Sequence, residues 1–188
     1  MIIRVPAVCS LAHKRYRALF WFGIHALIAF ATTVGLGMAG FRVNFTPSEP
    51  LGLWRIVELD GKLRIGDLIF ICPPPTDSML EARDRGYLRR GLCAGGFAPL
   101  IKTVAAVSGQ TVKVSEEVFI DGQRLSHSRV AKIDGQSRAM KPYEGGVVPL
   151  CAIYLHSAFS SSFDSRYFGP LAVKGVLGYA HEVWTYAP

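Results

Sequence analysis

The sequence lacks the signatures of a metal or cofactor site. Its 188 residues include four cysteines and five histidines, which are dispersed along the chain. None of them forms a CxxC pair, a His/Cys cluster or an HExxH motif. Internal repeats and low-complexity tracts are absent as well. We therefore expect neither a metal ion nor a cofactor.

Charged residues are missing from one long stretch near the start, residues 19–41, LFWFGIHALIAFATTVGLGMAGF. At about 1.5 Å per residue, a helix of about 23 residues exceeds the roughly 30 Å hydrocarbon core of a bilayer. A buried core helix that is so long and so apolar is not expected in a chain of this size. The stretch therefore predicts a transmembrane anchor. A cleaved signal sequence is the alternative, because residues 37–39, Gly-Met-Ala, form a small-x-small pattern.

Acidic residues are also absent before this stretch, whereas four basic residues precede it: Arg4, Lys14, Arg15 and Arg17. Positive charge favours the cytoplasmic side of a membrane segment. We therefore expect residues 1–18 to form a cytoplasmic basic segment, residues 19–41 an anchor in the inner membrane, and residues 42–188 a periplasmic domain.

The net charge of +7 at first suggests a nucleic-acid partner. Four of the 21 basic residues precede the anchor and all 14 acidic residues follow it, so the remainder carries 17 − 14 = +3. Its basic residues are scattered apart from one local run, Arg83, Arg85, Arg89 and Arg90, which is typical of a solvated helix face or loop. We therefore expect no direct contact with nucleic acid.

The chain after the anchor is typical of a mainly β domain. Short runs rich in Val, Ile, Leu and aromatic residues, separated by Gly and Pro, predict strands. These runs are residues 51–59, 63–72, 100–107, 111–114, 117–125, 150–156 and 176–186. Asp121-Gly122 predicts a type I′ hairpin turn, which needs positive φ at both central residues. Only residues 76–90 look helical, and the polar residues 126–146 predict a long loop or irregular hairpin.

Three cysteines fall in this domain, in a compartment where disulfides persist. Cys72 ends a predicted strand, and Cys93 begins the segment that follows the predicted helix. A bond between them would tie the helical insertion to the sheet. We therefore expect a Cys72–Cys93 disulfide and an unpaired Cys151.

A serine and a lysine are the candidates for catalysis. Ser48 lies between two prolines shortly after the apolar stretch, and no Ser-His-Asp arrangement is legible from the spacing. A serine needs a base, and Lys102 is the only charged residue between positions 90 and 113. Burial among apolar groups would lower its pKa until it accepts a proton at neutral pH. Taken alone, Ser48 also fits a turn, and Lys102 also fits a lysine that extends to solvent from a strand end.

Five segments, taken in order, resemble the boxes of the type I signal peptidases, and most closely their TraF-type conjugative-transfer branch. NFTPSEPLGLWR resembles the serine box, RIGDLIFICPPP the Gly-Asp box, LIKTVAAVSGQTV the lysine box, VFIDGQRL the following hairpin, and SFDSRYFGPL the last box. The GLWR, the CPPP and the insertion between Cys72 and Cys93 point to the TraF-type branch. The resemblance covers residues 42–185.

The resemblance implies roles for these residues. Ser48 would be the nucleophile and Lys102 the general base. The Ser48 N–H and the Thr46 hydroxyl would stabilise the oxyanion. Pro47 and Pro50 restrict the backbone around the nucleophile before substrate arrives.

The last box adds three residues. Ser162 matches the family's lysine-orienting serine, whereas Asp164 either orients the site or forms a structural ion pair with Arg166. The sequence also departs from ordinary signal peptidases, which carry Ser-Met where this chain has Ser48-Glu49. They carry Gly-Asp-Asn where it has His-Ser-Ala at residues 156–158. These departures argue against a housekeeping enzyme with broad specificity.

The resemblance further implies a fold of curved antiparallel sheets and a substrate. TraF-type peptidases mature the conjugative pilin precursor by removing a short C-terminal piece and joining the ends into a ring. The expected partners are a membrane-bound pilin precursor, the lipid bilayer and other envelope proteins of conjugation. Ser48 lies at most about 23 Å of extended chain beyond Phe41, so it would work close to the bilayer. A general signal peptidase that removes leader peptides and a non-catalytic scaffold of the conjugation apparatus are the alternatives.

Overall fold

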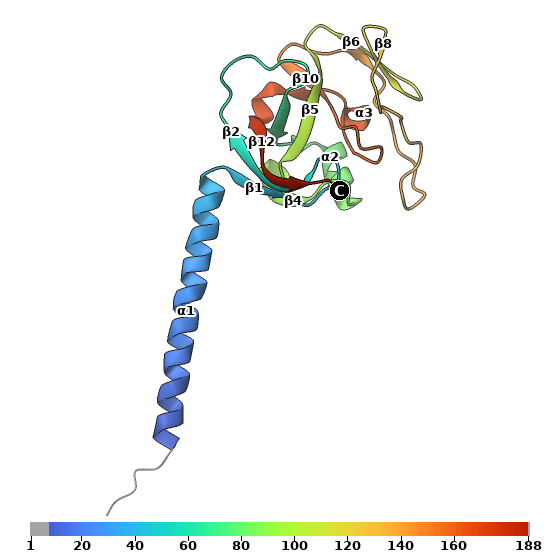
Figure 1. Ribbon diagram of the computed structural model, residues 1–188. Coiled ribbons are helices and arrows are strands. Elements are labelled where there is room, and N and C mark those ends of the chain that lie inside the picture. Colours follow the sequence, from blue (N-terminus) through green and yellow to red (C-terminus); the bar gives the residue numbers. More distant parts are fainter. Residues whose placement is uncertain (1–7, 188) are drawn as a thin grey trace, which may run out of the picture. The chain divides into compact units, whose positions relative to one another are not determined.

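The computed structural model describes residues 8–187, and the chain divides into two compact units between Phe41 and Arg42 (Figure 1). The first unit contains one long helix. The second contains both sheets, except for Phe41, which is the first residue of the first strand. Residues 1–7, which hold the start of the expected basic segment, lie outside the described residues.

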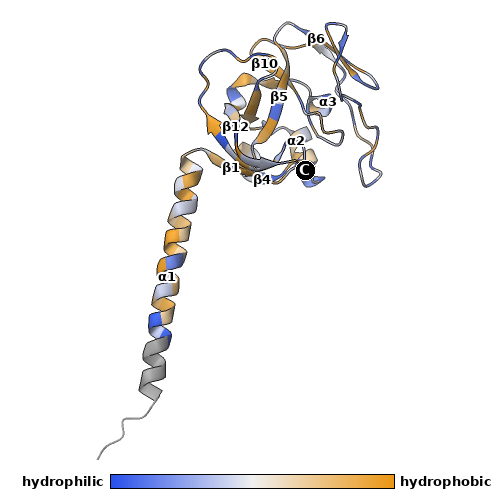
Figure 2. Cartoon of the chain, viewed as in Figure 1, coloured by the Kyte–Doolittle hydropathy of each residue, from blue (hydrophilic) through white to orange (hydrophobic). Residues whose placement is uncertain are grey.

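The helix of the first unit is α1 (Val8–Met38), and its part Arg15–Met38 is long and apolar enough to cross a membrane, by length and composition. Apolar colouring dominates this part in Figure 2. Thr32 Oγ1 and Thr33 Oγ1 each donate to the carbonyl four residues earlier at 2.8 Å, so both hydroxyls are satisfied within the helix. The helix ends three residues before the expected end of the anchor, where Gly40 takes φ of 87° and the chain turns into a strand.

The second unit is built on two sheets whose described registers are antiparallel (Figure 1). The larger sheet has the order β1 (Phe41–Asn44), β2 (Leu51–Val57), β12 (Val176–Tyr186), β3 (Leu68–Ile71), β5 (Leu100–Val107), β10 (Ala152–His156) and β11 (Leu171–Ala172). The smaller sheet has the order β8 (Gln123–Arg124), β7 (Val118–Ile120), β6 (Thr111–Val114) and β9 (Gly146–Val147). The mainly β prediction is confirmed.

The turn predicted between β7 and β8 is also confirmed. Asp121 and Gly122 take φ of 49° and 80°, as a type I′ turn requires. The strand expected over residues 63–72 is shorter than predicted, because its first half forms a turn. There Asp67 Oδ2 accepts from Arg64 N at 2.7 Å, and Gly66 takes φ of 95°.

The helix expected over residues 76–90 is real but shorter, since α2 covers only Asp77–Asp84. Thr76 caps its start by accepting from Met79 N at 3.4 Å. Gly86, at φ of 86°, ends it in a Schellman motif: Gly86 N donates to the Arg83 carbonyl and Tyr87 N to the Ala82 carbonyl, both at 2.9 Å. The chain then forms β4 (Arg90–Cys93), which the sequence pattern did not predict.

Three buried clusters form the core of the second unit. The largest packs strand residues such as Ile69, Val104 and Leu155 against Met79 of α2. A second cluster joins β5 and β10 to the smaller sheet, and a third surrounds Trp54. The short helices η1 (Ala94–Gly96), α3 (Ser165–Phe168) and η2 (Val173–Gly175) complete the unit. The strands that carry the candidate site therefore have buried apolar residues on both sides of the sheet.

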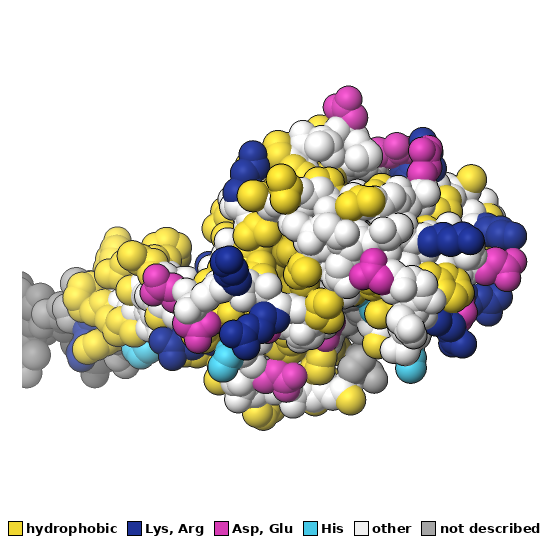
Figure 3. All heavy atoms as spheres, turned by 90° about the horizontal axis from the view of Figure 1, so that it is seen from above, with side chains coloured by type: hydrophobic (Ala, Val, Ile, Leu, Met, Phe, Trp, Pro, Cys, Tyr) yellow, Lys and Arg dark blue, Asp and Glu magenta, His cyan; other side chains and the backbone are white. Residues whose placement is uncertain are grey.

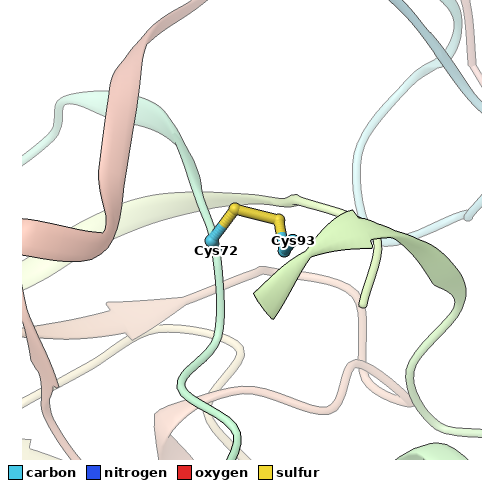
Figure 4. Close-up of a disulfide and its surroundings, with 2 residues drawn as sticks. All are labelled: Cys72 and Cys93. Atoms are coloured by element: carbon cyan, nitrogen blue, oxygen red, sulfur yellow. A yellow bond between two sulfur atoms is a disulfide. The ribbon is translucent and has the colours of Figure 1, made fainter. Parts of the chain in front are cut away.

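A disulfide joins Cys72, just after β3, to Cys93 at the end of β4 (Figure 4). The two Cα atoms are 5.6 Å apart, and the bond closes a loop with a sequence separation of 21 residues. It therefore ties both ends of the α2 insertion to the sheet. Cys151 is exposed and carries a free thiol.

Charges of both signs are mixed on the face of the protein shown in Figure 3. Basic side chains lie beside acidic ones and among neutral and apolar ones, and no stripe of one sign crosses this face. A nucleic-acid footprint consists of basic residues clustered on one face or along one helix. The face in Figure 3 does not have that character.

Candidate active site

The loop that carries Ser48 is residues 45–50, between β1 and β2. The Asn44 side chain holds this loop together from its start. Its Nδ2 donates to the carbonyls of Thr46, Glu49 and Pro50 at 2.9, 2.9 and 3.0 Å. Its Oδ1 accepts from Thr46 N at 3.0 Å and from Thr46 Oγ1 at 2.7 Å. One amide side chain thus satisfies five polar groups of a tight turn.

Thr46 was expected to donate to an oxyanion. In this structure its hydroxyl donates to Asn44 Oδ1 instead. A hydroxyl has a single proton to donate. Thr46 therefore orients the loop here, and it must leave Asn44 before it can donate to a developing oxyanion. Thr46 and Ser48 line the same cavity.

Lys102 is the third residue of β5, opposite Ile69 of β3, and only 3% of its surface is exposed. Its Nζ donates to Ser162 Oγ at 2.9 Å. Burial lowers the pKa of Lys102 to about 8, against the charges of Asp164 and Glu49, which raise it. An amine in this state exchanges its proton near neutral pH, as a general base must.

A cavity of about 680 Å³ brings the candidate nucleophile and base together. Ser48, Thr46, Lys102 and Ser162 all line it. Among the hydrogen bonds of the described residues, none joins Ser48 Oγ to Lys102 Nζ, and Lys102 donates to Ser162 instead. Catalytic hydrogen bonds are often long in a free enzyme and tighten when substrate binds.

The loop predicted over residues 126–146 supplies one wall of this cavity through Ile133, Asp134 and Met140. Asp134 orders the loop, because its carboxylate accepts from Arg138 Nε at 2.6 Å and from the Tyr87 hydroxyl at 2.5 Å. These hydrogen bonds, with that of Tyr87 the strongest, hold the pKa of Asp134 below its usual range. The loop is therefore irregular, as expected, and fixed by a charged side chain.

Asp164 and Arg166 form a fully buried ion pair next to the cavity. Arg166 Nε and Nη2 donate to the two carboxylate oxygens at 2.8 and 2.9 Å. Burial alone would raise the pKa of Asp164, but His156, whose Nδ1 lies 3.5 Å from Asp164 Oδ2, and the hydrogen bonds and charge of Arg166 hold it below its usual value. Asp164 is not among the residues that line the cavity, so it acts on Lys102 through its charge and through the loop it holds.

The sequence alone did not single out three residues that the structure connects to this site. Asn44 organises the serine loop, and Ser157 donates from its Oγ to the Ser48 carbonyl. Glu49 was noted only as a departure from the family's pattern. Burial raises its pKa to about 7, Lys102 opposes that rise, and Glu182 adds to it. An asparagine at the end of a strand before a proline-containing turn is a local signal for such a loop.

The mainly β fold agrees with the family comparison. The family model described as signal peptidase, peptidase S26, matches residues 15–185. The chain belongs to this family. It is a TraF-type, signal-peptidase-like protein, and its role is related to conjugation.

The relatives to which the chain is similar are conjugal and plasmid transfer proteins. The chain is 57% identical to a probable conjugal transfer protein TraF of Sinorhizobium fredii, over 99% of this chain and 100% of the relative. It is 52% identical to a conjugal transfer protein TraF of Agrobacterium tumefaciens, over 93% of this chain and 99% of the relative. A plasmid transfer protein TraF of Escherichia coli is 32% identical, over 79% and 85% of the two chains. A crystal structure of a signal peptidase I from Enterococcus faecalis aligns with a TM-score of 0.38 at 20% identity, over 63% of this chain and 97% of that one.

Proposed function

We propose that this protein is a membrane-anchored serine endopeptidase with a Ser48/Lys102 dyad. The observation that carries the proposal is Lys102, a buried amine with a pKa of about 8 that lines one cavity with Ser48. Peptidase S26 membership supports the reaction class. A lysine with an ordinary pKa would be almost wholly protonated at neutral pH and unable to accept the serine proton.

In this mechanism Ser48 Oγ attacks the scissile carbonyl while its proton passes to Lys102 Nζ. The tetrahedral oxyanion accepts from the Ser48 N–H, with Thr46 as a second donor once it leaves Asn44. Lys102 then gives the proton to the leaving amine, which departs and leaves an ester on Ser48. Ser162 holds Nζ through the 2.9 Å hydrogen bond, so the base is oriented before substrate binds.

We propose the conjugative pilin precursor as the substrate. We also propose that the protein is anchored in the inner membrane, with residues 1–18 in the cytoplasm and residues 42–188 in the periplasm. The apolar part of α1 and the TraF-type relatives support this assignment. A nucleophile seven residues beyond Phe41 is within about 23 Å of extended chain, so a cleavage site close to the bilayer is within reach. Other envelope proteins of conjugation are the further partners.

The ester on Ser48 is resolved in this proposal by the pilin's own N-terminal amine. Lys102, neutral again after protonating the leaving group, takes a proton from the attacking amine and returns it to Ser48 Oγ as the ester bond breaks and the new amide forms. A held amine has an effective molarity that exceeds the roughly 55 M of water by orders of magnitude. The ring is lighter than the linear cut chain by one water, which intact mass measures directly.

The test is Ser48→Ala in the full-length, membrane-inserted protein, with pilin maturation as the readout. Ser161→Ala is the matched control, because Ser161 is an exposed serine that lines the same cavity. We expect no maturation with Ser48→Ala and normal maturation with Ser161→Ala. Full maturation by the Ser48 variant at equal expression would favour a scaffold. Cleavage of leader peptides from unrelated preproteins would favour a general signal peptidase.

A further inference from the structure

Ser157 connects the two halves of the proposed dyad. It follows β10 directly and is only 1% exposed. Its Oγ donates to the backbone carbonyl of Ser48, and its N–H donates to Asp164 Oδ2 at 3.1 Å. We propose that Ser157 is a positioning residue that fixes the Ser48 backbone relative to Lys102. This inference rests on the proposed peptidase function.

The serine loop needs such an anchor, because its other hydrogen bonds are local. For residues 45–50 of the described chain, these bonds come from Asn44 and from Trp54 Nε1, which donates to the Pro50 carbonyl at 3.0 Å. Asn44 and Trp54 belong to the two strands that flank the loop. Their contacts shape the loop, but they do not fix it against β5, the strand that carries Lys102.

The flanking prolines also leave the backbone of Ser48 free to rotate. A proline ring fixes its own φ, and it restricts the residue before it to extended conformations. Pro47 and Pro50 therefore constrain positions 46, 47, 49 and 50 and leave ψ of Ser48 open. The Ser157 hydroxyl holds the Ser48 carbonyl and thus limits this remaining rotation.

Ser157 is suited to this task because it belongs to the framework of the base. In the sheet, β10 pairs with β5, and His156 lies opposite Thr103, next to Lys102. The segment from Ser157 to Ser162 therefore starts next to the strand that carries Lys102, and its last residue contacts Lys102, since Ser162 Oγ accepts from Lys102 Nζ. One short segment holds the nucleophile's carbonyl at its start and the base at its end.

Arg166 keeps that segment rigid. Its Nη2 donates to the carbonyls of Phe159 and Ser162 at 3.3 and 3.0 Å, and its Nη1 to the Arg129 carbonyl at 2.8 Å. Arg166 is itself fully buried. A hydroxyl on a segment fixed in this way transmits a defined position to Ser48, and misplacement of a reacting group by about 1 Å costs about 10²-fold in rate.

The test compares Ser157→Ala with the native full-length enzyme on pilin precursor in membranes, over a pH series. We expect kcat to fall by roughly 10- to 100-fold with KM changed by less than about twofold. The midpoint of the pH–rate curve should stay at its native value, because the groups that shift the pKa of Lys102 are its burial, Asp164, Glu49 and Arg166, and Ser157 is not one of them. Glu49→Gln, which removes a charge that raises the pKa of Lys102, is the comparison variant and should move that midpoint to lower pH.

A second variant, Ser157→Thr, keeps the hydroxyl and is expected to recover most of kcat. Thermal unfolding of each variant gives the folded fraction, to which the rates are normalised. The inference is overturned if Ser157→Ala keeps its native kcat, if its pH midpoint shifts, or if Ser157→Thr is no more active than Ser157→Ala. Ser48→Ala, run in parallel, separates the two claims: native activity there removes the peptidase proposal, whereas an inactive Ser48→Ala beside a fully active Ser157→Ala removes only the positioning role.

Discussion

Activity should follow the deprotonation of Lys102, whose pKa burial lowers to about 8. The neutral fraction of such an amine is about one-tenth at pH 7, about one-half at pH 8 and about nine-tenths at pH 9. Because only the neutral amine accepts the serine proton, kcat/KM should rise about tenfold between pH 7 and pH 9 and then level off. A lysine with its ordinary pKa near 10.4 would give about a hundredfold rise over the same range, with no plateau.

The assay is initial-rate cleavage of a peptide that spans the pilin cleavage site and has no group titrating between pH 6 and 10. Glu49→Gln is the perturbation that tests the cause. The Glu49 charge raises the pKa of Lys102, so its removal should move the midpoint to lower pH and increase activity at pH 7. Glu117→Gln, whose native carboxylate pairs with Arg124 in the smaller sheet, is the matched control and should leave the midpoint unchanged. A midpoint that stays in place with Glu49→Gln, or a profile that is flat from pH 6 to 9, would refute this reasoning.

Three further predictions concern the base, the serine loop and the disulfide. Lys102→Arg should be as inactive as Lys102→Ala in the same assay, because a guanidinium stays protonated; a near-native rate would make Lys102 purely electrostatic. Asn44→Asp keeps the acceptor but loses the Nδ2 amide group, which donates to three carbonyls, so kcat should fall at least about tenfold; unchanged kcat would show that the loop holds its shape without Asn44. Replacing Cys72 and Cys93 by Ser should cost about 3 kcal/mol and lower Tm by roughly 6–12 °C, whereas Cys151→Ser should not; equal Tm values would contradict the account.

Local patterns carried the prediction of the base. A single lysine among apolar residues at alternating positions predicts either a buried amine or one that reaches solvent from a strand end. In the structure Lys102 is buried, because β5 lies between β3 and β10 in the larger sheet. The hairpin turn at Asp121-Gly122 was equally local, since its chemistry depends on two adjacent residues.

Local signals also led to an error at the end of α2. Helix-forming residues after position 84 extended the predicted helix to residue 90, although Gly86 is the signal for the Schellman motif that ends α2. The disulfide was predictable for a different reason. Cys72 and Cys93 flank one insertion, and the ends of an insertion into a sheet return close together.

The arrangement around the dyad was not predictable from the sequence. The contact of Ser157 with the Ser48 carbonyl joins residues 109 positions apart, and that of Lys102 with Ser162 joins residues 60 apart. No spacing rule predicts such contacts, because they depend on how β10 pairs with β5 and on where the serine loop packs. Ser162 was identified only through the family resemblance, and Ser157, where this chain departs from the family's pattern, was not assigned a role.

The most direct test of the central claim is to trap the acyl-enzyme. Native protein mixed with pilin precursor and quenched in acid within the first turnover is digested and mapped by mass spectrometry. The account predicts an ester adduct on the peptide that contains Ser48, formed faster as pH rises from 7 to 9 and absent in Lys102→Ala. An adduct on any other residue, or pilin cleavage at the native rate by Ser48→Ala with no adduct at all, would contradict it.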